Sequence, residues 1–147
     1  FSFIKNNCNG KVKKSKKYSK TDQKLISDTN DLMKNLREEM NNQNLNNYIK
    51  SVIKISFLTN KYINDEEPWK LKKIDVSKMN NILYLSLALI AKISILLNPL
   101  IPKATSKVFK ALNIKDSLIN HKFLDGKNIF EDEIKIKELN ILFKKNT

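Results

Sequence analysis

The chain has few of the residues that form tight turns or disulfides. Its 147 residues include two glycines, three prolines and one cysteine. So few glycines and prolines argue against a sheet protein with many tight turns and favour long helices. The single cysteine, Cys8, excludes a disulfide within the chain and fits the reducing cytoplasm. The residues therefore predict an all-α, cytoplasmic protein.

Residues that carry out catalysis or bind metals are scarce as well. The sequence has no glycine-rich phosphate loop, no Gly-x-Ser-x-Gly and no histidine or cysteine pair at metal-ligand spacing. The only histidine, His121, stands alone, and we expect it at the surface. The acidic runs 66–67 and 131–133 fit solvated turns better than a general acid and base. We predict no catalytic residue, metal or cofactor in this chain and interpret it as a recognition module.

The charge is strongly positive. Lysine and arginine number 28 against 15 aspartates and glutamates, a net charge of +13. Such a balance favours an anionic partner such as nucleic acid or an acidic membrane. Arginine occurs only at Arg37, while lysine, asparagine and isoleucine are abundant, which AT-rich codons alone would also produce. Lys11, Lys13 and Lys14 belong to a run of six lysines between residues 11 and 20, which is either a solvated linker or a set of auxiliary phosphate contacts.

Apolar residues recur at helical spacing between residues 21 and 115 and predict a bundle of about five helices. The expected helices run from the cap Thr21 to the polar run 41–44, from 45 to 63, from Pro68 to Lys72, from about Lys78 to Asn98, and from Pro102 to Asn113. The uncharged stretch 79–91 is too short to cross a bilayer and is followed by Lys92. We therefore expect a buried central helix there and no membrane span.

We divide the chain into three parts. Residues 1–20 are predicted to be the end of a first helix and a mobile basic linker, 21–115 the bundle, and 116–147 an irregular tail. The alternation in 134–143 fits a strand, a helix or an extended segment docked on another domain. Because the chain begins at Phe1 in mid-pattern, we expect a fragment of a longer protein, with an apolar groove exposed where a preceding helix belongs.

The segment 60–73 places the only tryptophan, Trp69, after Pro68 and among lysines. A flat aromatic ring can stack an unpaired base while lysines hold its phosphate. The candidate contacts are Trp69, Asn60, Lys61 and Lys72. Two alternatives stay open: Trp69 is instead a core anchor between helices, and Asn60, expected on the buried face with Ile53 and Ser56, is instead a tie that fixes the turn.

This segment resembles the anticodon-binding domain of methionyl-tRNA synthetase, a class I aminoacyl-tRNA synthetase. The family joins two helices by Asn-x-Tyr-[Ile/Val]-x-x-x-x-Pro-Trp, which matches Asn60, Tyr62, Ile63, Pro68 and Trp69. Residues 97–105 are similar to the family's Pro-x-x-Pro element. Residues 3–12 and 139–145 are similar to the end of its first helix with the following linker and to the end of its core. The resemblance covers nearly the whole chain.

The resemblance implies that Trp69 stacks on a base of the CAU anticodon and that the partner is the methionine tRNA. It implies a parent ligase that attaches methionine to its tRNA using ATP. The family's catalytic signatures, and an Asn and Arg pair on its first helix, are not in this chain. The catalytic domain of the parent enzyme is then a further partner, and the tail 116–147 is expected to dock on it. ATP, and zinc if the enzyme uses it, would bind to that domain. This chain alone is expected to be inactive.

Two other functions stay open from the sequence. One is an anticodon-binding domain of a class I synthetase for valine, leucine or isoleucine. The other is a basic helical protein that lies on an acidic membrane surface or binds a partner helix.

Overall fold

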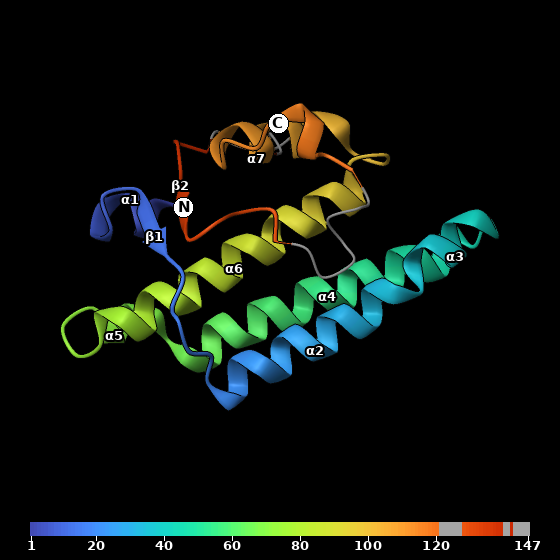
Figure 1. The fold of residues 1–147 in the computed structure, drawn as a ribbon. Helices are drawn as coiled ribbons and strands as arrows, with labels where there is room; N and C mark the ends of the chain where they lie inside the picture. The colour runs from blue at the N-terminus through green and yellow to red at the C-terminus, as the bar shows by residue number, and fades with distance from the viewer. Residues whose placement is uncertain (121–127, 140–141, 143–147) are drawn as a thin grey trace, which may run out of the picture.

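A computed structural model describes residues 1–120, 128–139 and Leu142. Four longer helices form its body (Figure 1): α2 (Lys20–Lys34), α4 (Leu45–Glu66), α6 (Val76–Leu97) and α7 (Pro102–Ala111). The shorter elements are α1 (Ser2–Asn7), α3 (Leu36–Asn41), α5 (Pro68–Leu71), the 3₁₀ turn η1 (Asp116–Leu118) and the strands β1 (Lys11–Lys13) and β2 (Glu133–Lys135). The prediction of an all-α bundle of about five helices is confirmed, and a two-stranded sheet is added to it.

Helix α6 lies at the centre of the bundle and is buried on every side. Thirteen of its 22 residues are buried. One side packs against α2, α3 and α4, and the other packs against α1, α7 and the two strands. A helix that is apolar all round belongs in such an interior. It is long and apolar enough to cross a membrane, but 67% of its most apolar window is buried inside the protein, as in a core helix.

The buried face of α4 differs from the predicted one. Its buried residues are Tyr48, Val52, Ile55, Thr59 and Tyr62. The predicted inward residues Ile53, Ser56 and Asn60 are exposed, and Ile53 is 61% exposed. From Val52 the buried stripe continues through Ile55 and Thr59. The Thr59 hydroxyl donates to the carbonyl of Ile55 at 2.9 Å, which satisfies it within the helix.

Helix α2 begins two residues earlier than predicted, because Ser19 and not Thr21 is its N-cap. The Ser19 hydroxyl accepts from the backbone N–H of Asp22 at 3.1 Å, and the Asp22 carboxylate accepts from the backbone N–H of Ser19 at 2.8 Å. This reciprocal pair is a capping box. The single helix expected up to residue 40 is divided at Asn35 into α2 and α3.

Two segments far apart in sequence form the small antiparallel sheet beside α6 (Figure 1). Val12 of β1 pairs with Ile134 of β2, and both side chains are almost completely buried in the core. The prediction of a mobile linker is therefore wrong for Lys11–Lys13. Part of the tail also packs on this chain's own core, so the expected irregular tail contains a strand.

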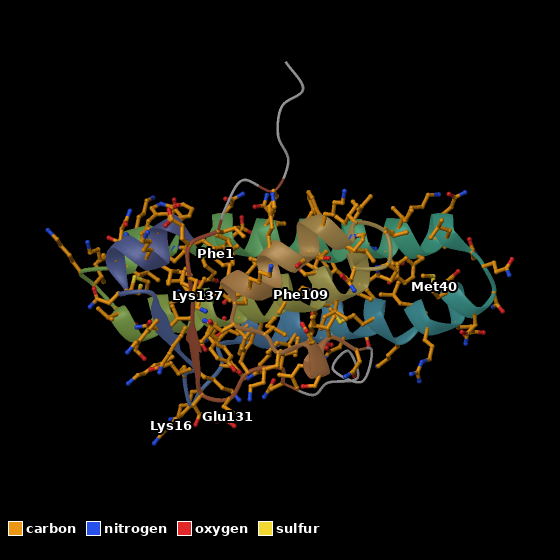
Figure 2. The ribbon with its side chains drawn as sticks, turned by 90° about the horizontal axis from the view of Figure 1, so that it is seen from above. Phe1, Lys16, Met40, Phe109, Glu131 and Lys137 are labelled. Atoms are coloured by element: carbon orange, nitrogen blue, oxygen red, sulfur yellow. The ribbon has the colours of Figure 1, made fainter. Side chains whose placement is uncertain are left out.

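The start of the chain lies beside the segment that follows β2, since Phe1 and Lys137 line the same pocket. Seen from above, Phe1 and Lys137 lie close together, whereas Met40 lies at the far end of the molecule (Figure 2). Docking of the tail on a catalytic domain stays a prediction. His121, which was expected at the surface, lies outside the described residues. So do residues 140, 141 and 143–145 of the segment that resembles the end of the family core.

If the tail belongs to this domain, shortening Ile134 will destabilise the whole bundle. We expect Ile134→Ala to lower the free energy of unfolding by about 2–5 kcal/mol, because it leaves a cavity at a buried contact. Thermal and urea unfolding of the chain would measure this loss. The neighbouring Lys135→Ala serves as the control, since Lys135 is exposed. Equal stability of the two variants would contradict the assignment.

Candidate nucleic-acid interface

The turn between α4 and α5 directs Trp69 outward. Helix α4 ends at Glu66, and Glu67 adopts a left-handed conformation with φ of 44° while its N–H donates to the carbonyl of Ile63 at 3.1 Å. Pro68 then starts α5, where its missing N–H leaves no donor unsatisfied. Pro68 is less than 2% exposed, whereas Trp69 is 46% exposed. The proline is thus the anchor at this turn, and the tryptophan offers about half of its surface to solvent.

Two lysines of this segment form local ion pairs. Lys61 lies 2.6 Å from Asp65, one turn along α4, and Lys70 lies 2.8 Å from Glu67. Both pairs are at the surface, where such a contact contributes about 0–1 kcal/mol. A phosphate group can therefore replace the carboxylate partner at little cost. Lys61 is available to a nucleic acid even though it is paired here.

Lys72 joins the tryptophan segment to α1. Its ammonium group donates to the side-chain oxygen of Asn7 at 2.7 Å, across 65 residues of sequence. Asn7 also lines a cleft of about 420 Å³ formed by the end of α1, by β1 and by the start of α6. Lys11 and Lys13 line the same cleft. The structure therefore brings the basic strand and the Trp69 segment to one end of the molecule.

The three candidate phosphate contacts, Lys11, Lys13 and Lys14, differ in how exposed their side chains are. Lys11 and Lys13 are exposed and flank the buried Val12, so they share the outer side of β1. Lys14 is half-buried, and its ammonium lies 5.9 Å from the centre of the Tyr18 ring, a cation–π contact. Lys14 is consequently more constrained than the other two.

Cys8 lies in the same cleft and is partly buried. Burial raises the pKa of its thiol, and the positive charge of Lys72 opposes this only in part. A thiol that stays protonated is a poor nucleophile. Within the described residues, no group of three histidines, cysteines, aspartates or glutamates could hold a metal ion.

Asn60 lies apart from the turn. It lines an apolar groove of about 420 Å³ between α4 and α6, together with Ile53, Phe57, Ile90 and other residues. An exposed amide needs no protein partner, and in the described part of the chain no hydrogen bond ties Asn60 to the Trp69 turn. The idea that Asn60 fixes the turn is therefore wrong, and a ligand contact is the alternative that stays open.

The sequence analysis missed a buried polar cluster behind the turn. Asp22, Tyr62 and Asn81 are each at most 5% exposed and are joined by hydrogen bonds. Burial, followed by the hydrogen bond to Asp22, raises the pKa of Tyr62, so its hydroxyl stays protonated and donates. The spacing Ser19-x-x-Asp22 could have indicated the capping box, but nothing in the sequence links it to Tyr62.

The fold is similar to that of a solved protein structure. The chain superimposes on the crystal structure of the apo form of Mycobacterium tuberculosis methionyl-tRNA synthetase with a TM-score of 0.88 at 17% identity. The match covers 99% of this chain and 30% of that one. At this identity the likeness concerns the fold: the bundle is built like the corresponding region of an aminoacyl-tRNA synthetase.

Sequence comparison gives the particular family. The model of the anticodon binding domain of methionyl tRNA ligase matches residues 12–147, and the chain belongs to this family. It is 31% identical over 107 residues to a methionine–tRNA ligase of Rhizobium meliloti, covering 73% of this chain and 21% of the relative. It is 30% identical over 146 residues to that of Sulfurisphaera tokodaii, covering 98% and 26%. The chain thus spans about a fifth to a quarter of these curated relatives.

The left-handed backbone at Glu67 gives a test of how the turn is held. We expect Glu67→Gly to raise stability by about 0.5–1 kcal/mol, because glycine adopts positive φ without the steric cost that other residues carry there. Glu67→Val should lower it by at least as much. Thermal unfolding would show both changes. Lys70→Ala, which removes only the ion-pair partner of Glu67, is the control; a Gly variant less stable than this control would contradict the interpretation.

Proposed function

We propose that this chain reads the CAU anticodon of the methionine tRNA as a domain of a complete, cytoplasmic methionine–tRNA ligase. The parent enzyme attaches methionine to its tRNA using ATP. The catalytic domain, ATP and any zinc belong to the part of the parent outside these residues, and this chain alone is inactive. The observation that carries the proposal is Trp69, which is half exposed beside a fully buried proline in the segment that characterises the family.

The ring supplies binding energy through stacking. Anticodon-loop bases are unpaired and can be turned outward to lie on an aromatic face. One stacked base contributes about 1–3 kcal/mol as measured by alanine substitution. At 1.4 kcal/mol for each tenfold change, this corresponds to about 5- to 150-fold in affinity. A single ring at this position can therefore help one tRNA to compete against others.

Lysines supply the charge that holds the RNA backbone. Lys61 and Lys72 lie on the elements that flank Trp69, and Lys11 and Lys13 lie on the neighbouring strand. Lys14 and Asn60 complete the candidate set. Lys14 lies against the ring of Tyr18, and Asn60 lines the groove between α4 and α6. Phosphate contacts position the RNA and base contacts specify it. In this proposal Trp69 contributes to specificity and the lysines contribute to affinity.

Family membership favours methionine over valine, leucine or isoleucine as the amino acid of the parent enzyme. Family membership also favours this function over that of a basic helical protein on an acidic membrane surface.

Removing the ring should weaken tRNA binding and leave the chemistry of amino-acid activation intact. In the complete ligase we expect Trp69→Ala to lower the affinity for methionine tRNA about 5- to 150-fold. ATP-dependent activation of methionine should be nearly unchanged. Filter binding and pyrophosphate exchange would measure the two quantities.

A graded variant and a distant control sharpen this test. Trp69→Phe keeps an aromatic face and should retain much of the affinity. Leu45→Ala removes another exposed apolar side chain at the opposite end of α4, about 30 Å from the turn, and should not affect binding. Equal loss of tRNA binding and methionine activation in Trp69→Ala would count against a role in anticodon recognition.

The basic strand makes a separate prediction about salt. Each of Lys11→Ala and Lys13→Ala should weaken tRNA binding and reduce the slope of log K against log salt by about 0.7, because one phosphate contact is lost. Lys103→Ala, an exposed lysine at the start of α7, should leave the slope unchanged. Anionic vesicles form a parallel arm: vesicle binding as tight as tRNA binding would favour a membrane surface instead.

A further inference from the structure

The carboxylate of Asp22 is the centre of a buried hydrogen-bond cluster. One of its oxygens accepts from the hydroxyl of Tyr62 at 2.6 Å, and the other accepts from the side-chain amide of Asn81 at 2.8 Å and from the backbone N–H of Ser19. Asp22 is 4% exposed. A buried carboxylate is costly to hold unless it is hydrogen-bonded, so these donors keep three separate segments together.

The two side-chain donors come from the helices on either side of the proposed interface. Tyr62 lies on the last turns of α4, directly before the Trp69 turn, and Asn81 lies on the first turns of α6, directly after it. The backbone N–H of Ser15, in the basic segment that follows β1, donates to the side-chain oxygen of Asn81 at 3.3 Å. The cluster therefore connects the end of α4, the start of α6 and the basic segment, and α5 lies between the two helix ends.

A second contact holds the same two helix ends at the surface. Lys78 of α6 lies 2.9 Å from Glu66 of α4, and the Glu66 side chain is only 13% exposed. Between them, the buried cluster and this ion pair fix the separation of the end of α4 from the start of α6. The short helix α5 lies between those two ends, so their separation constrains its position, together with the buried Pro68.

We propose that Tyr62 and Asp22 are positioning residues for Trp69, which hold the α4 and α6 ends so that its ring faces outward for stacking. This inference rests on the proposed function only in assuming that the Trp69 ring stacks on a base. Neither residue touches the RNA; they act through the turn.

The test uses the complete ligase and a matched pair of hydroxyl deletions. Tyr62→Phe removes the donor to Asp22 and keeps the ring. Tyr48→Phe removes an equally buried hydroxyl on the same face of α4, which donates to the carbonyl of Leu96 at 2.6 Å. The two tyrosines are fourteen residues apart, about 21 Å along the helix. Asp22→Asn is a second variant at the cluster.

The position of the Trp69 ring is read directly by labelling with 5-fluorotryptophan. Its ¹⁹F resonance is assigned by its disappearance in Trp69→Phe. We expect Tyr62→Phe and Asp22→Asn to shift or broaden this resonance and to weaken methionine tRNA binding about five- to 20-fold, a part of the effect of removing the ring. Tyr48→Phe should lower the melting temperature by a similar amount and change neither the resonance nor the affinity.

The outcomes separate positioning from general stability. An unchanged Trp69 resonance in Tyr62→Phe, measured well below its melting temperature, would overturn the proposal, as would an equal response in Tyr48→Phe. A moved resonance together with normal tRNA binding in Trp69→Ala would support positioning while refuting the proposed stacking function. The experiment can therefore refute the positioning role of Tyr62 and Asp22 and the stacking role of Trp69 separately.

Discussion

The burial of α6 on every side is the constraint from which the rest of the structure follows. A 22-residue helix with almost no polar face cannot lie at the surface, so other elements must cover it completely. Helices α2 and α4 cover one side, while α1, α7 and the small sheet cover the other. Residues 11–13 and 133–135 are mostly lysine and glutamate. They pair as strands, and this pairing places the side chains of Val12 and Ile134 against α6.

The proposed interface lies where this core ends. At the junction of α4 and α6 the apolar packing gives way to buried Pro68, the Asp22 cluster and the Glu66–Lys78 pair. Each of these contacts holds the backbone near the α4–α6 junction and leaves the surface around Trp69 open. Trp69 is left outside because its neighbour already fills the interior position. A rigid support beneath an exposed ring reduces the entropy lost when a base stacks on it.

The net charge of +13 is less informative than its distribution. Two lysines near the turn, Lys61 and Lys70, are paired with carboxylates one turn away, which lowers their local effect. Lys11 and Lys13 differ because strand geometry holds both on one side of a cleft. In the proposed function, Lys11 and Lys13 contribute to affinity from positions that the backbone already holds.

Local periodicity and the backbone of single residues were enough to predict the helical class, a buried central helix at about 78–98 and the turn that Pro68 begins. The sequence did not predict the whole inward face of α4, because apolar residues lie on both sides of the Tyr48–Val52 stripe and only packing against the other helices selects Ile55, Thr59 and Tyr62. Nor did it predict the strand pair Val12–Ile134 or the contact of Asp22 with Tyr62, which join residues 122 and 40 positions apart. Such contacts depend on which surfaces meet in space, and only the tertiary structure decided that Trp69 faces outward while Pro68 does not.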